Sequence, residues 1–428
     1  MKVLKLFSSM AKIGVIGFGG GNALIPIIHK NIVEEEGLVS QEEYEEDVLV
    51  ASITPGALPV EIAGGIGRRL AGWKGMMAGS VGMAFPGVFL TILLLSFLTE
   101  LEAGLVRQVS FLTVGITAFI VCMLTDYVIQ TMKRADNLSL RLQYGVIILG
   151  VFTLTGEKNL YRLFGIDRIP VFGLSTINVF LTAFFLIFIY SIFQRNRQFG
   201  QEIRFWGIVE MGKEVCMLLF FVVLTGIFAY FVAKNVVDYL RNGLLSSLMS
   251  FGGGDAYLTV AEGLFVESGF ITEDIFYGSI VPLVNILPGS VLCKTLSAVG
   301  YFIGFVQSGS IWGGYIVAIA GFFTSIAGSC GVISVVGWIY RMFGEIPVFR
   351  LIKKWIRPIV SGLMLNVMLS LVYQARKIGI AENMGWMPVV VMVVIYGINM
   401  FLYYKKRINN VIMVLVSVGM SWVLCNLG

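Results

Sequence analysis

The sequence predicts an all-α polytopic membrane protein. Of its 428 residues, 57% are hydrophobic and only 13% are charged, which is about half the charged fraction of a typical soluble domain, and the mean hydropathy is +0.86. A membrane helix needs roughly 20 apolar residues to cross about 30 Å of hydrocarbon, so the chain has room for about ten to thirteen spans. This composition rules out a soluble globular protein.

The composition also narrows the function. The chain has one histidine, His29, and five cysteines that form no CxxC pair and no cluster with metal-ligand spacing. No GxxxxGK[ST] sequence is present. We therefore expect a transporter or channel without a metal or other cofactor, and not an enzyme. We assign the net charge of +5 to loop residues that set topology, because nucleic-acid binding would need a soluble basic face.

Long apolar runs mark the expected spans. They lie at about 75–98, 109–130, 172–193, 214–233, 311–340, 358–373, 388–403 and 410–426, with a shorter run at 144–155. Two other stretches, 8–70 and 241–305, are rich in glycine and contain Pro, Asn, Asp and Glu. We expect these two stretches to form broken or re-entrant elements.

Clusters of Lys and Arg in short loops mark the cytoplasmic side of a membrane protein. Such clusters occur near residues 2–5, 68–74, 133–141, 195–204, 341–357 and 405–407. Counting the spans between them predicts a multi-pass protein of the cytoplasmic membrane with its N-terminus inside and its C-terminus outside. Only Arg376 and Lys377 then fall on the outer side. No cleavable signal peptide is expected.

An internal repeat is the strongest pattern in the sequence. Phe18 opens FGGGNA and Phe251 opens FGGGDA, 233 residues later. The same spacing relates Pro55-Gly56 to Pro288-Gly289, and Gly67 to Gly300. It also relates Glu34 to Glu267. We predict a first repeat over residues 1–204, a linking transmembrane helix over 205–238 and a second repeat over 239–428.

The predicted orientations make the two repeats inverted. The span at 75–98 runs outward, whereas its counterpart at 311–340 runs inward. The span at 214–233 has no partner in the first half and supplies the extra crossing that turns the second copy over. Inverted repeats with interrupted helices are the architecture expected of alternating-access transporters.

The glycine and Pro-Gly motifs are the candidate binding elements. Consecutive glycines permit positive φ, and proline removes a backbone donor, so both interrupt a helix. A helix that restarts there presents N–H groups and the positive end of its dipole, which together bind anions. The alternative is that the glycines only allow tight helix packing. The residues concerned are Phe18, Gly19, Gly20, Gly21, Asn22, Pro55, Gly56, Phe251, Gly252, Gly253, Gly254, Asp255, Pro288 and Gly289.

Ionisable residues inside the glycine-rich stretches are the second group of candidates, because charges within a membrane are costly. Arg68 and Lys294 are expected to attract an oxyanion, and Glu61 to carry a coupling proton. Topology explains Arg68 equally well, since it forms a basic cluster with Arg69 and Lys74. The acidic run between Glu34 and Asp47 is expected to be a solvated loop and an amphipathic connection.

These motifs occur in a recognisable order. KIGVIGFGGGNALIP at 12–26 is followed by an acidic segment, by TPGALPVEIAGGIGRRLAG at 54–72 and by Phe85-Pro86-Gly87. This order resembles the chromate transporter family of inner-membrane proteins, whose long members have two homologous halves in opposite orientation. The resemblance implies a long member.

The resemblance also implies a function and a set of motif positions. It implies export of chromate, with oxyanions such as sulfate as further substrates, coupled to the proton-motive force. By position, the glycine motif of the family falls on residues 19–21 and its Pro-Gly-Pro motif on Pro55 and Gly56. The third position of the latter is Ala57 here and Ser290 in the second copy.

The sequence thus predicts a secondary transporter for a small inorganic oxyanion, working by alternating access in a lipid bilayer. The alternative is a passive anion channel or a membrane scaffold without transport activity. No nucleic-acid partner is expected. The oligomeric state is left open, with a homodimer as one option.

Overall fold

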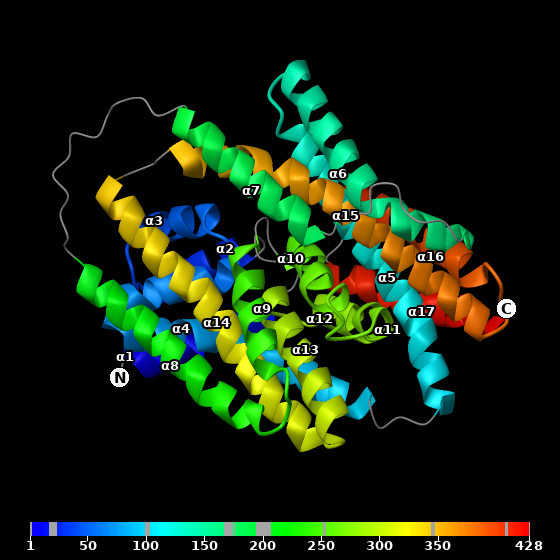
Figure 1. Cartoon of the computed structure of the whole chain (residues 1–428), viewed down its shortest axis with the longest axis horizontal. Coiled ribbons are helices and arrows are strands. Elements are labelled where there is room, and N and C mark those ends of the chain that lie inside the picture. Colours follow the sequence, from blue (N-terminus) through cyan, green and yellow to red (C-terminus); the bar gives the residue numbers. More distant parts are fainter. Residues whose placement is uncertain are drawn as a thin grey trace. The chain divides into compact units, whose positions relative to one another are not determined.

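The computed structural model describes residues 2–16, 24–98, 103–166, 174, 176–193, 207–250, 254–343, 347–406 and 410–427. Within these residues every regular element is a helix (Figure 1). The prediction of an all-α polytopic protein is confirmed. The first glycine motif, Phe18–Asn22, and residues 251–253 of the second lie outside the described residues.

The chain divides into two compact units, and each contains segments from both halves of the sequence. Unit 1 comprises Met1–Leu93, Phe180–Ile271 and Leu287–Ile356. Its complete elements are α1 (Lys2–Ile16), α2 (Leu24–His29), the π-helix η2 (Lys30–Glu35), α3 (Gln41–Ile53), α8 (Ile208–Tyr230), α9 (Val236–Leu248), α10 (Gly254–Ala261), the π-helix η3 (Glu262–Val266), α13 (Val291–Ser308) and α14 (Ile311–Phe343). It also holds most of α4 (Leu58–Leu98).

Helix α4 is a hairpin of two legs and not one straight span. Ala71 and Gly72 leave helical geometry, and Gly72 has a φ of 58°. The legs touch so closely that a Cβ on Gly67 would clash with the main-chain oxygen of Gly75. The first leg lies in the stretch that was expected to be broken or re-entrant. It is helical because small residues let the two backbones approach each other.

Helices α13 and α14 repeat this hairpin arrangement in the second half of the chain. A Cβ on Gly304 would clash with the main-chain oxygen of Gly313, and one on Gly300 would lie 2.7 Å from the oxygen of Val317. Gly309, with a φ of 64°, ends α13 and turns the chain. Gly67 and Gly300, which the repeat spacing relates, therefore occupy the same kind of contact.

Other local features recur at the repeat spacing. The π-helices η2 and η3 follow α2 and α10. The amide of Leu38 donates to the oxygen of Ile32 over 2.9 Å, and the amide of Ile271 donates to that of Phe265 over 3.1 Å. Both pairs are 233 residues apart. These matches support the predicted repeat at the level of the backbone.

Unit 2 comprises Leu94–Val179, Thr272–Ile286 and Arg357–Gly428. Its complete elements are α5 (Ala103–Lys133), α6 (Leu138–Phe164), α11 (Glu273–Ile275), the π-helix η4 (Phe276–Ile280), α12 (Val281–Ile286), α16 (Met387–Phe401), the π-helix η5 (Leu402–Lys406) and α17 (Asn410–Leu427). A core of Phe111, Val114, Ile395 and Cys425 joins α5, α16 and α17. Helices α7 (Thr176–Phe193) and α15 (Pro347–Ala381) belong partly to each unit.

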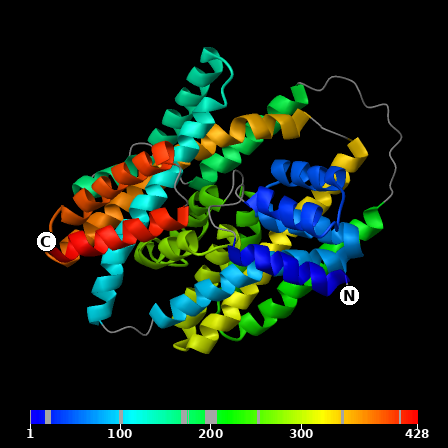
Figure 2. The ribbon, with the colours of Figure 1, turned by 180° about the vertical axis from the view of Figure 1, so that it is seen from behind.

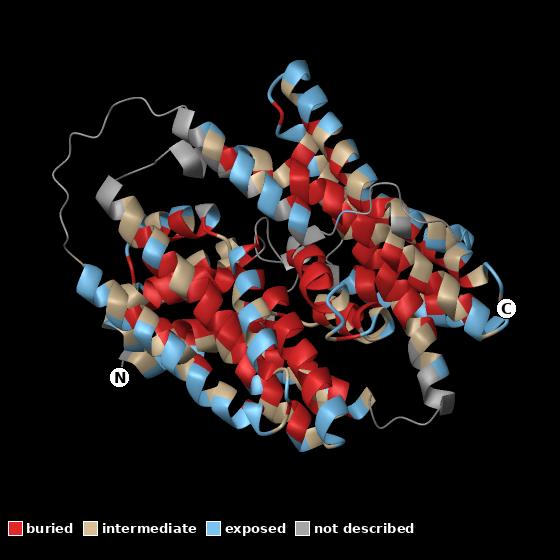
Figure 3. Ribbon diagram, viewed as in Figure 1, coloured by how far each residue is buried: buried red, intermediate tan, exposed pale blue. Residues whose placement is uncertain are grey.

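Eight helices in the described part of the chain are long and apolar enough to cross a membrane. This criterion gives fewer than the expected ten to thirteen spans, partly because it takes α4, with its two legs, as one helix. In the most apolar window of α8, 17% of the residues are buried, against 78% in α13 (Figure 3). An apolar helix with so much exposed surface is suited to contact lipid.

The acidic run is more ordered than the sequence predicted. From Gln41 it forms α3, which begins with a capping box between Ser40 and Glu43. Asp47, on this helix, is only 2% exposed, and it accepts a hydrogen bond of 2.8 Å from Nε of Arg69. Glu42, Glu43 and Glu45 on α3 are exposed, as expected of an amphipathic connection, whereas the burial of Asp47 against Arg69 was not predicted.

Candidate functional site

The first Pro-Gly break separates α3 from α4 and is held by hydrogen bonds from distant parts of unit 1. Gly56 has a φ of 143°, which only glycine adopts readily. Its amide donates to the main-chain oxygen of Ser250 over 2.8 Å, and the amide of Ala57 donates to the hydroxyl of Ser329 over 3.1 Å. Two of the backbone N–H groups that were expected to face a substrate are therefore already hydrogen-bonded within the protein.

The second Pro-Gly break precedes α13 and is built more locally. Gly289 has a φ of 90°. Ser290 is the N-cap of α13, and its hydroxyl accepts a hydrogen bond of 3.4 Å from the amide of Cys293. The ammonium group of Lys294 donates to the main-chain oxygen of Leu287 in the same break. The N-terminus of α13 is therefore capped by a residue of the adjoining break.

Close backbone packing fixes the second break against α1 and α4. A Cβ built on Gly289 would lie 3.5 Å from Cα of Gly87 and 3.7 Å from the oxygen of Gly14. A Cβ on Gly87 would clash with the oxygen of Pro288. Gly82 on α4 likewise lies against the main chain of α1 at Phe7. Figure 2 shows α1 as the dark blue helix that begins at the N-terminus. The glycine of the Phe85-Pro86-Gly87 motif thus has a packing role beside the break.

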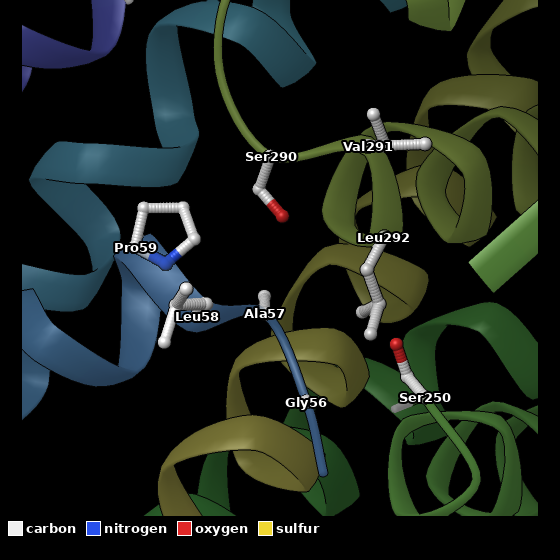
Figure 4. Close-up of a pocket in the computed structure, with 8 residues that line it drawn as sticks. All are labelled: Gly56, Ala57, Leu58, Pro59, Ser250, Ser290, Val291 and Leu292. Carbon is white, nitrogen blue, oxygen red and sulfur yellow. The ribbon is translucent and has the colours of Figure 1, made fainter. Parts of the chain in front are cut away.

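One small pocket of unit 1 brings the two breaks together. Gly56, Ala57, Leu58 and Pro59 line it from the first copy, and Ser290, Val291 and Leu292 from the second, with Ser250 at the end of α9 (Figure 4). The hydroxyl of Ser290 points into the space between the two chain segments (Figure 4). Residues 233 positions apart therefore meet, as they would at the interface of two repeats.

The pocket is bordered by two helix N-termini and is narrow in this conformation. The first turns of α4 and α13 both border it, and the N-terminus of a helix carries roughly half a positive elementary charge. The space that the centre of a water molecule can reach is about 10 Å³, which is room for about one water molecule. A tetrahedral oxyanion is larger, so binding one would require the first turns of α4 and α13 to separate.

Two buried charges stand next to the Pro-Gly breaks, and neither is among the residues that line the pocket. Glu61, on the first leg of α4, is fully buried, and a Cβ on Gly56 would clash with its carboxylate. Lys294, one turn into α13, is 1% exposed. The structure thus places both predicted residues beside the Pro-Gly breaks.

Arg68 lies elsewhere in unit 1. Its guanidinium group is 4.0 Å from the carboxylate of Glu214 on α8, and both side chains are largely buried. The neighbouring Arg69 pairs with Glu46 and Asp47 on α3, at 2.8 Å each. Burial raises the pKa of the Asp47 carboxyl, and the hydrogen bond and charge of Arg69 oppose this effect. Arg68 is not among the residues that line the pocket.

The remaining candidates belong to the two glycine motifs. Phe18, Gly19, Gly20, Gly21 and Asn22 lie outside the described residues, as do Phe251, Gly252 and Gly253. Gly254 begins α10, and the side chain of Asp255 is also outside the description. The glycine motifs therefore stay predictions.

The sequence did not predict three serines of this site. Ser250, just after α9, and Ser329 on α14 accept hydrogen bonds from the first break. No local sequence pattern marks either residue. Ser290 occupies the third position of the second Pro-Gly motif, so the motif itself could have identified it. Among the described residues, no group of three or more His, Cys, Asp or Glu side chains is placed to hold a metal ion.

Comparison with known proteins adds a family to this geometry. Residues 4–236 and 237–422 each match the family described as "Chromate transporter". An uncharacterized transporter of Methanocaldococcus jannaschii is 23% identical over 432 residues, covering 98% of this chain and 94% of that protein. No solved structure matches the chain.

Shorter matches involve proteins named for chromate. A probable chromate transport protein of Synechococcus elongatus is 36% identical over 96 residues, which are 22% of this chain and 24% of that protein. A chromate transport protein of Cupriavidus metallidurans is 28% identical over 125 residues, 29% of this chain and 30% of that protein. The double match to the family covers nearly the whole sequence, and eight described helices are apolar enough to span a membrane. This multi-pass membrane protein belongs to the chromate transporter family.

Proposed function

We propose that this chain is a secondary transporter that exports a small oxyanion across the cytoplasmic membrane. Chromate is the first candidate substrate, because of the family and the names of two relatives, and sulfate-like dianions are the second. The observation that carries the proposal is the pocket in which both Pro-Gly breaks meet. Two helix N-termini and the buried cation Lys294 give it the electrostatics of an anion site.

The size of the pocket supports alternating access. An anion cannot enter while the pocket has room for about one water molecule. The walls come from α4 in the first half of the chain and α13 in the second. We propose that movement of these two hairpins relative to each other opens the pocket to one side of the membrane and then to the other.

The helix directions in unit 1 support an inverted repeat. Along the contact between α4 and α14, Ala57 meets Ser329, Gly64 meets Cys330 and Arg68 meets Gly337. Helix α14 therefore runs in the same sense as the first leg of α4 and against the second leg of α4. By the repeat spacing, that second leg is the counterpart of α14. We propose repeats over residues 1–204 and 239–428, with α8 in the linking segment 205–238.

A topology follows from this arrangement. We propose a cytoplasmic N-terminus and an external C-terminus, as the distribution of Lys and Arg predicts. Cysteines introduced near each terminus of a cysteine-free variant should react with an impermeant maleimide from opposite sides of the membrane. Labelling of both termini from the same side would contradict the odd number of crossings that two inverted repeats joined by a single linking span require.

Transport itself is tested with purified protein in liposomes. We expect vesicles loaded with unlabelled chromate to accumulate radiolabelled chromate by counterflow, and an imposed membrane potential to drive net flux. Gly150→Ala is a matched control for the variants described below, because a Cβ on Gly150 in α6 would meet nothing within 4 Å. Saturable counterflow would support the transporter, and unsaturable flux without counterflow would indicate the passive channel.

Energy coupling and assembly need their own measurements. We propose that the proton-motive force drives export and that Glu61 carries the proton. Flux should therefore respond to pH in the parent protein and lose that response in Glu61→Gln. A homodimer is the assembly to examine first, by the mass of the purified protein in detergent. No movement of chromate or sulfate by vesicles in which a control carrier works would refute the oxyanion proposal.

A further inference from the structure

Glu61 and Lys294 occupy the same position in the two copies of the repeat. They are 233 residues apart, and each lies five residues after the glycine of its Pro-Gly break. Glu61 is fully buried and Lys294 is 1% exposed. The repeat therefore places a buried acid beside the first Pro-Gly break and a buried base beside the second. A buried charge is costly unless it is paired or carries out a function.

The two buried groups differ in their hydrogen-bond partners. The ammonium group of Lys294 donates to the main-chain oxygen of Leu287, which stabilises its charged form. Neither oxygen of Glu61 accepts a hydrogen bond of ordinary geometry from any described residue. The hydroxyl of Thr54 lies close enough to interact with Glu61, but it donates to the main-chain oxygens of Val50 and Ala51.

Few ionisable groups surround Glu61. Cys293 on α13 and Cys330 on α14 interact with it electrostatically, and Thr54 faces it from the end of α3. Lys294 on α13 acts on Cys293, and Glu214 on α8 acts on Cys330. Glu214 itself is 4.0 Å from Arg68. Among the described residues, no cation forms an ion pair with Glu61.

The position of the Glu61 carboxylate links it to the pocket. It occupies the space beside Gly56 that a side chain would otherwise fill, and Gly56 lines the pocket. An anion in the pocket and an ionised Glu61 would repel each other across the glycine backbone. Such repulsion is strong where water is excluded.

We propose that the pocket accepts an anion only when Glu61 is protonated, so that each anion is bound and carried together with one proton. Lys294 supplies the constant positive charge that attracts the anion. The proton comes from the aqueous side to which the site is open, and it leaves Glu61 when the anion leaves on the other side. This inference rests on the proposed function and specifies the direction in which the proton moves.

The proposal has a consequence for energetics. A dianion and one proton moving together carry a net charge of −1. A membrane potential that is negative inside drives this charge outward, whereas an inward proton gradient opposes it. Export by this protein would therefore draw on the membrane-potential component of the proton-motive force and work against its pH component.

Proton uptake on binding tests the proposal directly. Titration calorimetry of the purified full chain with chromate, in two buffers of different ionisation enthalpy, gives the protons taken up per anion. We expect the parent protein to take up about one proton more than Glu61→Gln, since the protonation of chromate itself is common to both. Glu61→Asp keeps a carboxyl group and should restore the uptake. Lys294→Gln should bind at least about tenfold more weakly while keeping the proton uptake, because its loss removes only attraction.

Sulfate provides a second measurement that needs no variant, because it stays a dianion throughout the neutral range. Its affinity for the parent protein should fall about tenfold for each unit of rising pH above the titration midpoint, as required when one proton must bind with the anion. Equal proton uptake by the parent and Glu61→Gln, or a sulfate affinity that is independent of pH, would overturn the inference while leaving the transporter intact. Failure of the parent protein to bind either anion would overturn the proposed function as well.

Discussion

The two Pro-Gly breaks share a backbone and differ in how they are held. Both place a glycine at positive φ, 143° for Gly56 and 90° for Gly289. The first break depends on Ser250 and Ser329, which are far away in the sequence. The second is capped by its own Ser290. A repeated motif can therefore keep its shape in both copies while its supporting contacts diverge.

The same comparison extends to charge. The first break is followed by a buried carboxylate and the second by a buried ammonium group, at equivalent positions. Two identical halves would place two like charges beside one pocket, which is costly in a low dielectric. The opposite charges of Glu61 and Lys294 avoid that cost, and under the proposal above they give the proton and the anion separate groups.

The largest expected effect comes from adding a methyl group at the first break. In Gly56→Ala the Cβ would clash with the Glu61 carboxylate and lie 3.2 Å from Cα of Ser329. In Gly289→Ala the nearest atom is 3.5 Å away, so the cost is mainly the strain of positive φ, about 1–3 kcal/mol. We expect Gly56→Ala to abolish chromate counterflow and Gly289→Ala to reduce it partly. Equal loss of counterflow in both variants would show that the strain of positive φ causes the loss, and that the clash with Glu61 adds nothing.

The hairpin glycines should give the next largest effect. In Gly67→Ala the new Cβ would overlap the main-chain oxygen and carbon of Gly75. In Gly300→Ala it would lie 2.6 Å from the hydroxyl of Tyr239 and 2.7 Å from the main-chain oxygen of Val317, so the overlap with the main chain is deeper at Gly67. Overpacking of this kind costs about 1–3 kcal/mol. The thermal unfolding midpoint should fall more for Gly67→Ala than for Gly300→Ala. Gly150→Ala should leave it nearly unchanged, and the idea fails if Gly67→Ala behaves like this control.

Exchange of the third motif residue tests the local cap. Ser290→Ala removes the acceptor for the amide of Cys293 and a hydroxyl that lines the pocket. Loss of an N-cap costs about 0.5–2 kcal/mol, and loss of one hydrogen bond to an anion should raise the KM for chromate roughly threefold to tenfold. Ala57→Ser, at the equivalent position, should leave the KM within about twofold, because the Ala57 amide is already bonded to Ser329. A larger effect of Ala57→Ser would reverse the comparison.

The smallest effect concerns the helices before each break. Ser40 caps α3 in a reciprocal box with Glu43, whereas Thr272 caps α11 through its hydroxyl alone. Ser40→Ala should therefore increase hydrogen exchange in the first turn of α3 more than Thr272→Ala does in α11, by about 1 kcal/mol. Equal increases would mean that the reciprocal bond adds nothing.

The same box predicts a pH dependence. The hydrogen bond from the Ser40 amide lowers the pKa of Glu43. The box therefore stabilises α3 above the ordinary carboxyl pKa, and this contribution is lost as the pH falls through the lowered value. The protection of the first turn of α3, measured relative to the intrinsic exchange rate at each pH, should fall at acidic pH in the parent protein and change less in Glu43→Gln. An identical acid response in that variant would exclude Glu43 as its source.

The extent to which the sequence predicted the structure depends on the element. Apolar runs located α8, α14, α16 and α17 closely, because a lipid-facing helix must be apolar over its whole length. The first leg of α4 was not counted among the spans, although a helix was expected to restart after the Pro-Gly break. Its glycines and the pair Arg68 and Arg69 resemble a broken interfacial segment, and only the contact with the second leg and the ion pairs to Glu214 and Asp47 explain why it is helical.

The residues of the candidate site were also predicted with unequal success. The repeat spacing selected Pro55-Gly56 and Pro288-Gly289, and the structure brings both to one pocket. Arg68 was selected by charge alone, and it lies in an ion pair away from that pocket. Charge in a membrane sequence indicates that a partner or a function must exist, but it does not indicate which.

By itself, the sequence determined that this protein is helical, lies in a membrane and carries a motif twice, because composition and spacing are properties of the chain alone. Only the tertiary structure decided which backbone donors were already used by Ser250 and Ser329, and that Glu61 lies against Gly56. The physical reason is that hydrogen bonds and steric contacts join residues across hundreds of positions, and no local pattern records such partners.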